Sequence, residues 1–74
     1  MTTINGSAHN GPENTILEVV MTWTNRELND DGTPTDGGRL GIAVAVNGAV
    51  VPRSRWFDTP AQGEIDIVTA VQGG

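Results

Sequence analysis

The first half of the chain holds one stretch in which apolar side chains recur at helical spacing. Between positions 15 and 28, the side chains that fall near one side are Ile16, Leu17, Val20, Trp23, Thr24 and Leu28. The stretch opens with Thr15 and Glu18, whose hydroxyl and carboxylate suit a capping box for the first free backbone donors. We predict a helix from Thr15 to about Leu28. Its β-branched residues lower its propensity, so packing against a sheet must hold it.

The second half of the chain alternates with a period of two, as strands do. Residues 42–46 place Ile42, Val44 and Val46 on one face and Ala43 and Ala45 on the other. Residues 64–71 set Ile65, Ile67, Thr69 and Val71 against Asp66, Val68 and Ala70. Both faces of the first segment are apolar, which predicts a central strand. The second segment predicts the last strand of the sheet.

Two Asn-Gly pairs, Asn5-Gly6 and Asn47-Gly48, predict two-residue hairpin turns, because both residue types tolerate positive φ. The first turn would join arms at residues 2–5 and 7–12. The second of these arms is short of β-branched residues and is the weaker strand. The second turn would return the chain as a strand until Pro52 removes a ladder donor.

These elements run in the order hairpin, helix, hairpin, final strand. One helix then packs on one face of a mixed sheet of four to five strands, an α+β arrangement. Residues 53–57 would form a turn or a short helical segment that places Trp56 in the core. The 74 residues are expected to form a single domain, residues 1–74, since a chain this short buries only about 60% of its unfolded surface.

Residues 29–41 contain almost no apolar side chains and are dense in turn formers. We predict a mobile loop here, between the helix and the next strand. Its acidic residues Asp30, Asp31 and Asp36 lack the glutamate that closes a calcium-binding loop. We therefore interpret the segment as a solvated loop and not as a metal site.

Charge and composition exclude several kinds of partner. Nine acidic residues against four arginines give a net charge of −5, which argues against binding to nucleic acid or to an anionic membrane surface and favours protein partners. With no Cys and one His, we expect neither a metal site nor a cofactor. So short a chain has little room for a substrate pocket. No apolar run or signal-like N-terminus stands out, so we expect a cytoplasmic protein.

Three motifs in the C-terminal half carry a resemblance. Asn47-Gly48 is followed by Val-Pro-Arg-Ser-x-Trp at 51–56 and by Val-Thr-Ala-Val-Gln-Gly-Gly at 68–74. In order and spacing they resemble the ThiS family of sulfur carriers in thiamin biosynthesis. The N-terminal half is similar only in outline, since the loop at 29–41 is longer than expected and the second strand is weak.

The resemblance implies a ubiquitin-like β-grasp fold and a carried substrate in place of an enzyme. An E1-like adenylyltransferase of the ThiF type would adenylate the carboxylate of Gly74 with ATP. Sulfur from a persulfide, supplied by a donor such as a cysteine desulfurase, would then replace AMP and leave a thiocarboxylate. Thiazole synthase of the ThiG type would accept that sulfur.

The residues that would carry this role lie at the end of the chain. Residues 72–74 would form a flexible tail, and Gly73 and Gly74 lack a Cβ that would hinder threading into a narrow channel. Gly74 would be modified, while Gly73, Gln72 and Val71 would serve in tail recognition. If Ile65, Ile67 and Val71 face the helix, an apolar docking patch forms on the open face of the sheet. Its members would be Val68, Ala70, Ala43 and Ala45, with Arg53 and Arg55 either adding charge contacts or simply solvated.

Three other functions fit parts of the same pattern. A molybdopterin-type sulfur carrier would share the fold, the terminal diglycine and the activation chemistry. A ubiquitin-like modifier would be conjugated to lysines of other proteins. A plain interaction module would keep its function without the tail.

Overall fold

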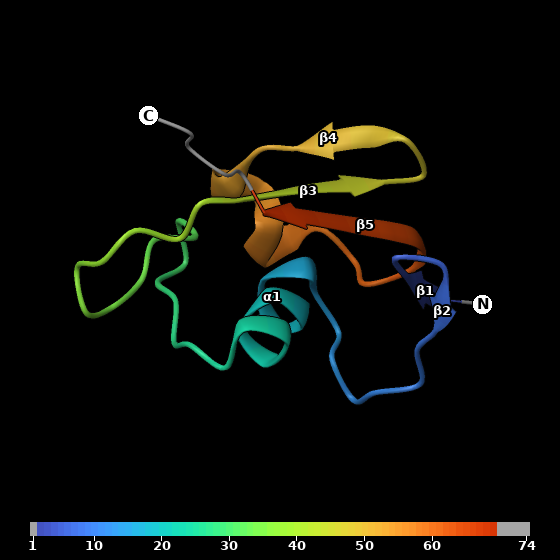
Figure 1. Cartoon of the computed structure of the whole chain (residues 1–74), viewed down its shortest axis with the longest axis horizontal. Helices are drawn as coiled ribbons and strands as arrows, with labels where there is room; N and C mark the ends of the chain where they lie inside the picture. The colour runs from blue at the N-terminus through green and yellow to red at the C-terminus, as the bar shows by residue number, and fades with distance from the viewer. Residues whose placement is uncertain (1, 70–74) are drawn as a thin grey trace.

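The computed structural model describes residues 2–69, which form a five-stranded sheet with one α-helix (Figure 1). The strands are β1 (Thr2–Ile4), β2 (Ser7–Ala8), β3 (Ile42–Val46), β4 (Ala49–Val51) and β5 (Gly63–Thr69). The helices are α1 (Ile16–Thr24) and the 3-10 helix η1 (Arg53–Asp58). The strand order β2-β1-β5-β3-β4 places the last strand at the centre of the sheet.

The sheet is mixed because β5 pairs differently with its two neighbours. It runs parallel to β1, with Ile4 opposite Ile65, and antiparallel to β3, with Val44 opposite Ile67. The hairpins β1–β2 and β3–β4 are both antiparallel and flank this centre. Figure 1 shows α1 on one side of the sheet. The predicted α+β arrangement with one main helix is confirmed.

The core lies between α1 and the sheet. Its buried side chains are Ile16, Leu17, Val19, Val20, Leu28, Ile42, Val44, Trp56, Ile65 and Ile67. Trp56 is 1% exposed, and its indole N–H donates to the carbonyl of Val51 at 3.0 Å. The predicted short helical segment at 53–57 and the core position of Trp56 are therefore confirmed.

The helix begins where the sequence predicts and ends earlier. Thr15 caps it by accepting a hydrogen bond from the N–H of Glu18 at 3.3 Å. The prediction that it extends to about Leu28 is wrong, because the chain turns left-handed at Asn25, with φ of 57°. Leu28 is still buried in the core, and its backbone forms a bridge with Pro34. Trp23, in contrast, is 45% exposed.

The second arm of the first hairpin is also shorter than predicted. β2 contains only Ser7 and Ala8, in place of residues 7–12. Beyond it the chain turns away toward the helix, and the imidazole Nε2 of His9 lies 2.7 Å from the carboxylate of Glu13. Pro12 offers no ladder donor and the segment has no β-branched residue, which accounts for the short strand.

The connection from α1 to β3 makes local hydrogen bonds. The backbone N–H of Asn29 donates to the carbonyl of Thr33 at 2.7 Å, and the N–H of Gly32 donates back to Asn29 at 2.9 Å. Gly32 and Pro34 are buried. The segment 29–41 thus buries more of itself than its composition indicates, and its mobility in solution stays a prediction.

Candidate functional site: the end of β5 and the open face of the sheet

The C-terminal segment follows β5, the central strand of the sheet. β5 ends at Thr69, which pairs with Ile42 at the start of β3. The predicted sites at Ala70, Val71, Gln72, Gly73 and Gly74 lie outside the described residues. The structure therefore describes the end of β5 at Thr69, which we call the root of the C-terminal segment, and the surface beside it.

Both Asn-Gly turns are formed, and their asparagine side chains hold β5 from its two sides. Asn5 and Asn47 adopt positive φ, 51° and 52°, as two-residue turns of this kind require. The side-chain oxygen of Asn5 accepts from the N–H of Ile67 at 2.8 Å. That of Asn47 accepts from the N–H of Glu64 at 2.9 Å. The turns therefore extend the hydrogen bonding of β5 beyond the strands that flank it.

The register of β5 decides which side chains face away from the helix. Ile65 and Ile67 are 0% and 3% exposed, so they point into the core. Val68 is 58% exposed and lies opposite Ala43, which is also exposed. Ala45 is half-buried and lies opposite Asp66. The structure thus brings Val68, Ala43 and Ala45 to the open face, and their role in docking stays a prediction.

Sequence reasoning missed one member of this surface. Val50 is 74% exposed and lies opposite Ala45 on the edge strand β4. Its alternation with the half-buried Val51 was the available signal, since successive strand residues point to opposite faces. We call Val68, Ala43, Ala45 and Val50 the open-face patch. The carboxylates of Asp66 and Glu64 are exposed on the same face of β5.

The two arginines near the patch in sequence have partners within the chain. Arg55 forms an ion pair with Asp58 at 3.2 Å. The guanidinium carbon of Arg53 lies 5.9 Å from the centre of the Trp56 ring, a cation–π distance. Both arginines are exposed, so these contacts contribute little to stability.

The surface hollows lie along α1, and two of them are lined in part by charged side chains, Arg26 and Glu27 in one and Glu13 and Glu18 in the other. A groove of about 190 Å³ lies between the β1–β2 hairpin and α1, with Ile4, Val19 and Trp23 among its lining residues. His9 is its one titratable lining residue. Within residues 2–69, no cluster of three or more His, Cys, Asp or Glu side chains is placed to hold a metal ion. The same residues contain no helix with the length and apolarity of a membrane span.

A mixed sheet with β5 between β1 and β3, and one helix across a single face, defines a ubiquitin-like β-grasp protein. The chain matches the ThiS family over residues 4–74, and it belongs to that family. The predicted resemblance is confirmed. Membership implies a small sulfur carrier of thiamin biosynthesis that works with ThiF-like and ThiG-like enzymes. A search of the curated proteins finds no match.

Proposed function

We propose that this chain carries sulfur on the carboxylate of Gly74 for the thiazole ring of thiamin. An E1-like enzyme of the ThiF type adenylates that carboxylate, a persulfide supplies the sulfur, and thiazole synthase of the ThiG type accepts it. The protein is then a co-substrate of its partner enzymes. Its place of action is the cytoplasm, where ATP is available.

The observation that carries the proposal is the family match, which includes β5 and runs through Gly73-Gly74. β5 is the central strand of the sheet and is hydrogen-bonded on both sides. A partner that binds the domain would therefore also fix the position of Thr69, from which the C-terminal segment continues toward the partner's active site. Support for the docking surface comes from the open-face patch, since Val68 is next to Thr69 in β5.

The chemistry explains why a carrier needs an activating partner. A carboxylate resists attack by sulfur because oxygen leaves it poorly. An oxygen of the Gly74 carboxylate attacks the α-phosphorus of ATP, so that pyrophosphate leaves and an acyl adenylate forms. The terminal sulfur of a persulfide then attacks the carbonyl carbon and AMP leaves. A thiol then attacks the donor's sulfur atom in the resulting acyl disulfide, so that a disulfide forms between the thiol and the donor and the thiocarboxylate of Gly74 leaves.

The residues of the chain suit this sequence of steps. Gly73 and Gly74 have no Cβ, so a narrow channel could admit them. Gln72 and Val71 would be read by the walls of that channel. The open-face patch, with Ala70 beside it in sequence, would dock the partner. The chain has no Cys or Lys that could attack its own activated carboxyl group.

The decisive experiment is covalent labelling. The protein is incubated with a ThiF-type enzyme, ATP and a persulfide donor, then treated with a thiol-reactive reagent and digested. Because the chain has no Cys, the thiocarboxylate is its only thiol-like group. We expect label on the C-terminal peptide and none on a variant that lacks Gly74. Absence of label, with an enzyme that activates a control carrier, would overturn the proposal.

A second step separates the thiamin branch from its nearest alternative. The thiocarboxylate form is offered to thiazole synthase with its other substrates and, separately, to the large subunit of molybdopterin synthase. Loss of the thiocarboxylate only in the first reaction is the expected result. Transfer only in the second would assign the chain to molybdopterin synthesis. A ubiquitin-like modifier would instead appear as conjugates of higher mass on cellular proteins.

A further inference from the structure

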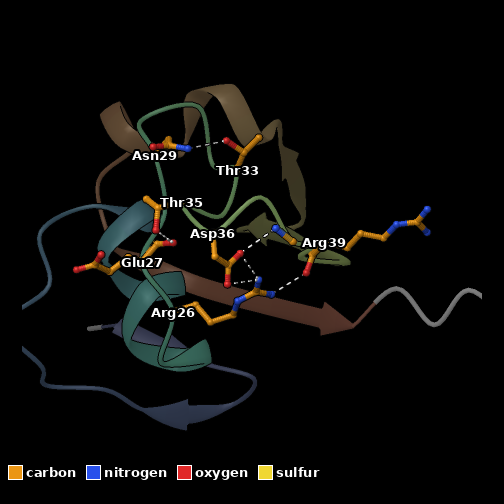
Figure 2. Close-up of polar contacts among 8 residues, drawn as sticks. Arg26, Glu27, Asn29, Thr33, Thr35, Asp36 and Arg39 are labelled. Carbon is orange, nitrogen blue, oxygen red and sulfur yellow. Dashed lines mark hydrogen bonds and ion pairs between the residues drawn. The ribbon is translucent and has the colours of Figure 1, made fainter.

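Hydrogen bonds among Arg26, Asp36, Gly38 and Arg39 fix the last part of the connection between α1 and β3 (Figure 2). We call this set of contacts the lock. The guanidinium of Arg26 donates to the carboxylate of Asp36 at 3.2 Å and to the backbone carbonyl of Arg39 at 2.6 Å. The same carboxylate accepts from the N–H of Gly38 at 2.8 Å. The hydrogen bond from Gly38 and the charge of Arg26 lower the pKa of Asp36. The carboxylate therefore stays ionised at neutral pH.

A side chain at Gly38 would displace the ends of the side chains that form the lock. A Cβ at this position would lie 2.8 Å from the Arg26 guanidinium and 3.0 Å from the Asp36 carboxylate. On the other side of Arg39, the side chain of Leu40 packs against the core. The backbone of Arg39 is thus held between a polar anchor and an apolar one. Its position relative to the sheet is set by the fold.

The held backbone lies near the root of the C-terminal segment. Arg39 precedes Ile42 by three residues, so their Cα atoms are within about 11 Å of each other. Ile42 pairs with Thr69, the last described residue of β5. Figure 2 shows the Arg39 carbonyl turned toward Arg26, while the side chain extends away from the lock toward solvent.

Arg39 also differs from the other arginines in its contacts. In the part of the chain that the structure describes, Arg26 and Arg55 form ion pairs and Arg53 lies over Trp56. The guanidinium of Arg39 takes part in none of these contacts. In a protein with a net charge of −5, this exposed cation stands at the end of the sheet from which the C-terminal segment continues. Such a charge is suited to an anionic group on a partner.

We propose that Arg39 docks on a carboxylate at the rim of the channel through which the activating enzyme takes up the C-terminal segment. This inference rests on the proposed function. The five residues after Thr69 span at most about 18 Å. In this proposal that length takes Gly74 to the nucleotide, while Arg39 contacts the entrance of the channel. It is a binding residue that orients the carrier and takes no part in the chemical step.

The test compares two variants that change the net charge equally, from −5 to −6. Arg39→Gln removes the proposed contact. Gln62→Glu adds one negative charge at an exposed position before β5, at the opposite end of that strand from Thr69. ATP–pyrophosphate exchange by a ThiF-type enzyme, followed against carrier concentration, gives KM and kcat for each. We expect KM to rise about three- to tenfold for Arg39→Gln only, with kcat within about twofold.

Salt and nucleotide provide further readouts. Raising the ionic strength should increase the KM of the parent protein more than that of Arg39→Gln, because screening weakens a contact that the variant has lost. The loss of affinity should persist when binding is measured without ATP. An effect of Arg39 that exists only with ATP bound would show that it contacts the nucleotide phosphates, and would overturn the proposal.

The lock has its own test. Asp36→Ala removes the acceptor that holds Gly38 and Arg26, and it moves the net charge from −5 to −4. Long-range charge alone would improve binding to an acidic rim, whereas a freed Arg39 predicts a higher KM. An unchanged or lower KM would show that the lock does not serve Arg39.

Equal KM values for Arg39→Gln and Gln62→Glu would overturn the inference and leave the proposed function standing. Failure of the parent protein to be adenylated at all would overturn both.

Discussion

The side-chain oxygen of Asn5 accepts a hydrogen bond from the backbone N–H of Ile67 at 2.8 Å, across 62 positions of the chain. Asn5 is a turn residue with φ of 51°, so one side chain serves both the first hairpin and the central strand. Its own backbone N–H also donates to the carbonyl of Ile65 at 2.9 Å. The first turn is therefore a part of the sheet as well as a connection between two strands.

Replacing Asn5 should separate its two roles. Asn5→Gly keeps the positive φ but leaves the N–H of Ile67 without its acceptor, which should lower the free energy of unfolding by about 1–3 kcal/mol. Asn5→Asp keeps an acceptor and should cost less. Urea denaturation followed by fluorescence measures both. Equal stability of Asn5→Gly and the parent protein would show that the long-range bond contributes nothing net.

Features that depend on residues close in sequence were predicted correctly. Features that depend on contacts between distant segments were not. The Asn-Gly turns and the Thr15 cap were predicted because each depends on residues close in sequence. The end of α1 was not, because Leu28 joins the buried core from the segment that follows the helix, where its backbone bridges to Pro34. A helical pattern counts a buried apolar residue without showing which element buries it.

The same limit applies to the candidate site. Alternation along β5 placed Val68 on the open face, since period two needs only the local sequence. The position of Val50 on the same face could have been predicted in this way, from its alternation with Val51. The contact between Arg26 and Asp36 could not, because it depends on the path of the chain between them.

Gly63 and Gly6 provide a matched pair of substitutions. Both have a positive φ, 86° and 85°, so alanine introduces similar backbone strain at each. A Cβ at Gly6 meets no atom within 4 Å, whereas one at Gly63 would lie 2.5 Å from the side-chain oxygen of Asn47. That oxygen accepts the N–H of Glu64 and would have to move away.

We expect Gly6→Ala to lower the free energy of unfolding by about 1 kcal/mol and Gly63→Ala by about 1–2 kcal/mol more. Chemical denaturation of the two variants in parallel gives the difference. Asn47→Gly removes the obstructing side chain. In that background, Gly63→Ala should lower the free energy of unfolding by much less than it does in the parent protein. A loss no greater for Gly63→Ala than for Gly6→Ala would contradict this account of the second turn.

Glu13 should make the stability of the protein depend on pH in the acid range. A hydrogen bond from His9, then one from its own backbone N–H, lowers the pKa of its carboxyl group below the ordinary value. Because the folded pKa is the lower one, the stabilisation is fully present above the pKa of the unfolded state and is lost as the pH falls through the folded pKa.

The measurement is the urea midpoint between about pH 6 and pH 3. Glu13→Gln should reduce the loss of stability toward low pH. The control is Glu27→Gln, at an exposed position after the end of α1, and its stability should change with pH as that of the parent protein does. Gly11→Ala should act like Glu13→Gln, since its Cβ would collide with both the imidazole of His9 and the carboxylate of Glu13. Parallel curves for the parent protein and Glu13→Gln would rule out this contact as a source of the pH dependence.

The open-face patch predicts a loss of function without a loss of folding. Val68 is 58% exposed and Val50 is 74% exposed, so aspartate at either position stays in water and should change the free energy of unfolding by less than about 1 kcal/mol. A carboxylate in the centre of a docked apolar surface would lack a partner, so each variant should lower kcat/KM for adenylation about tenfold or more. Trp23→Gln removes an exposed apolar side chain from α1, on the opposite side of the sheet, and should leave kcat/KM unchanged. If Val68→Asp and Val50→Asp are adenylated as well as Trp23→Gln, the activating enzyme docks elsewhere on the domain.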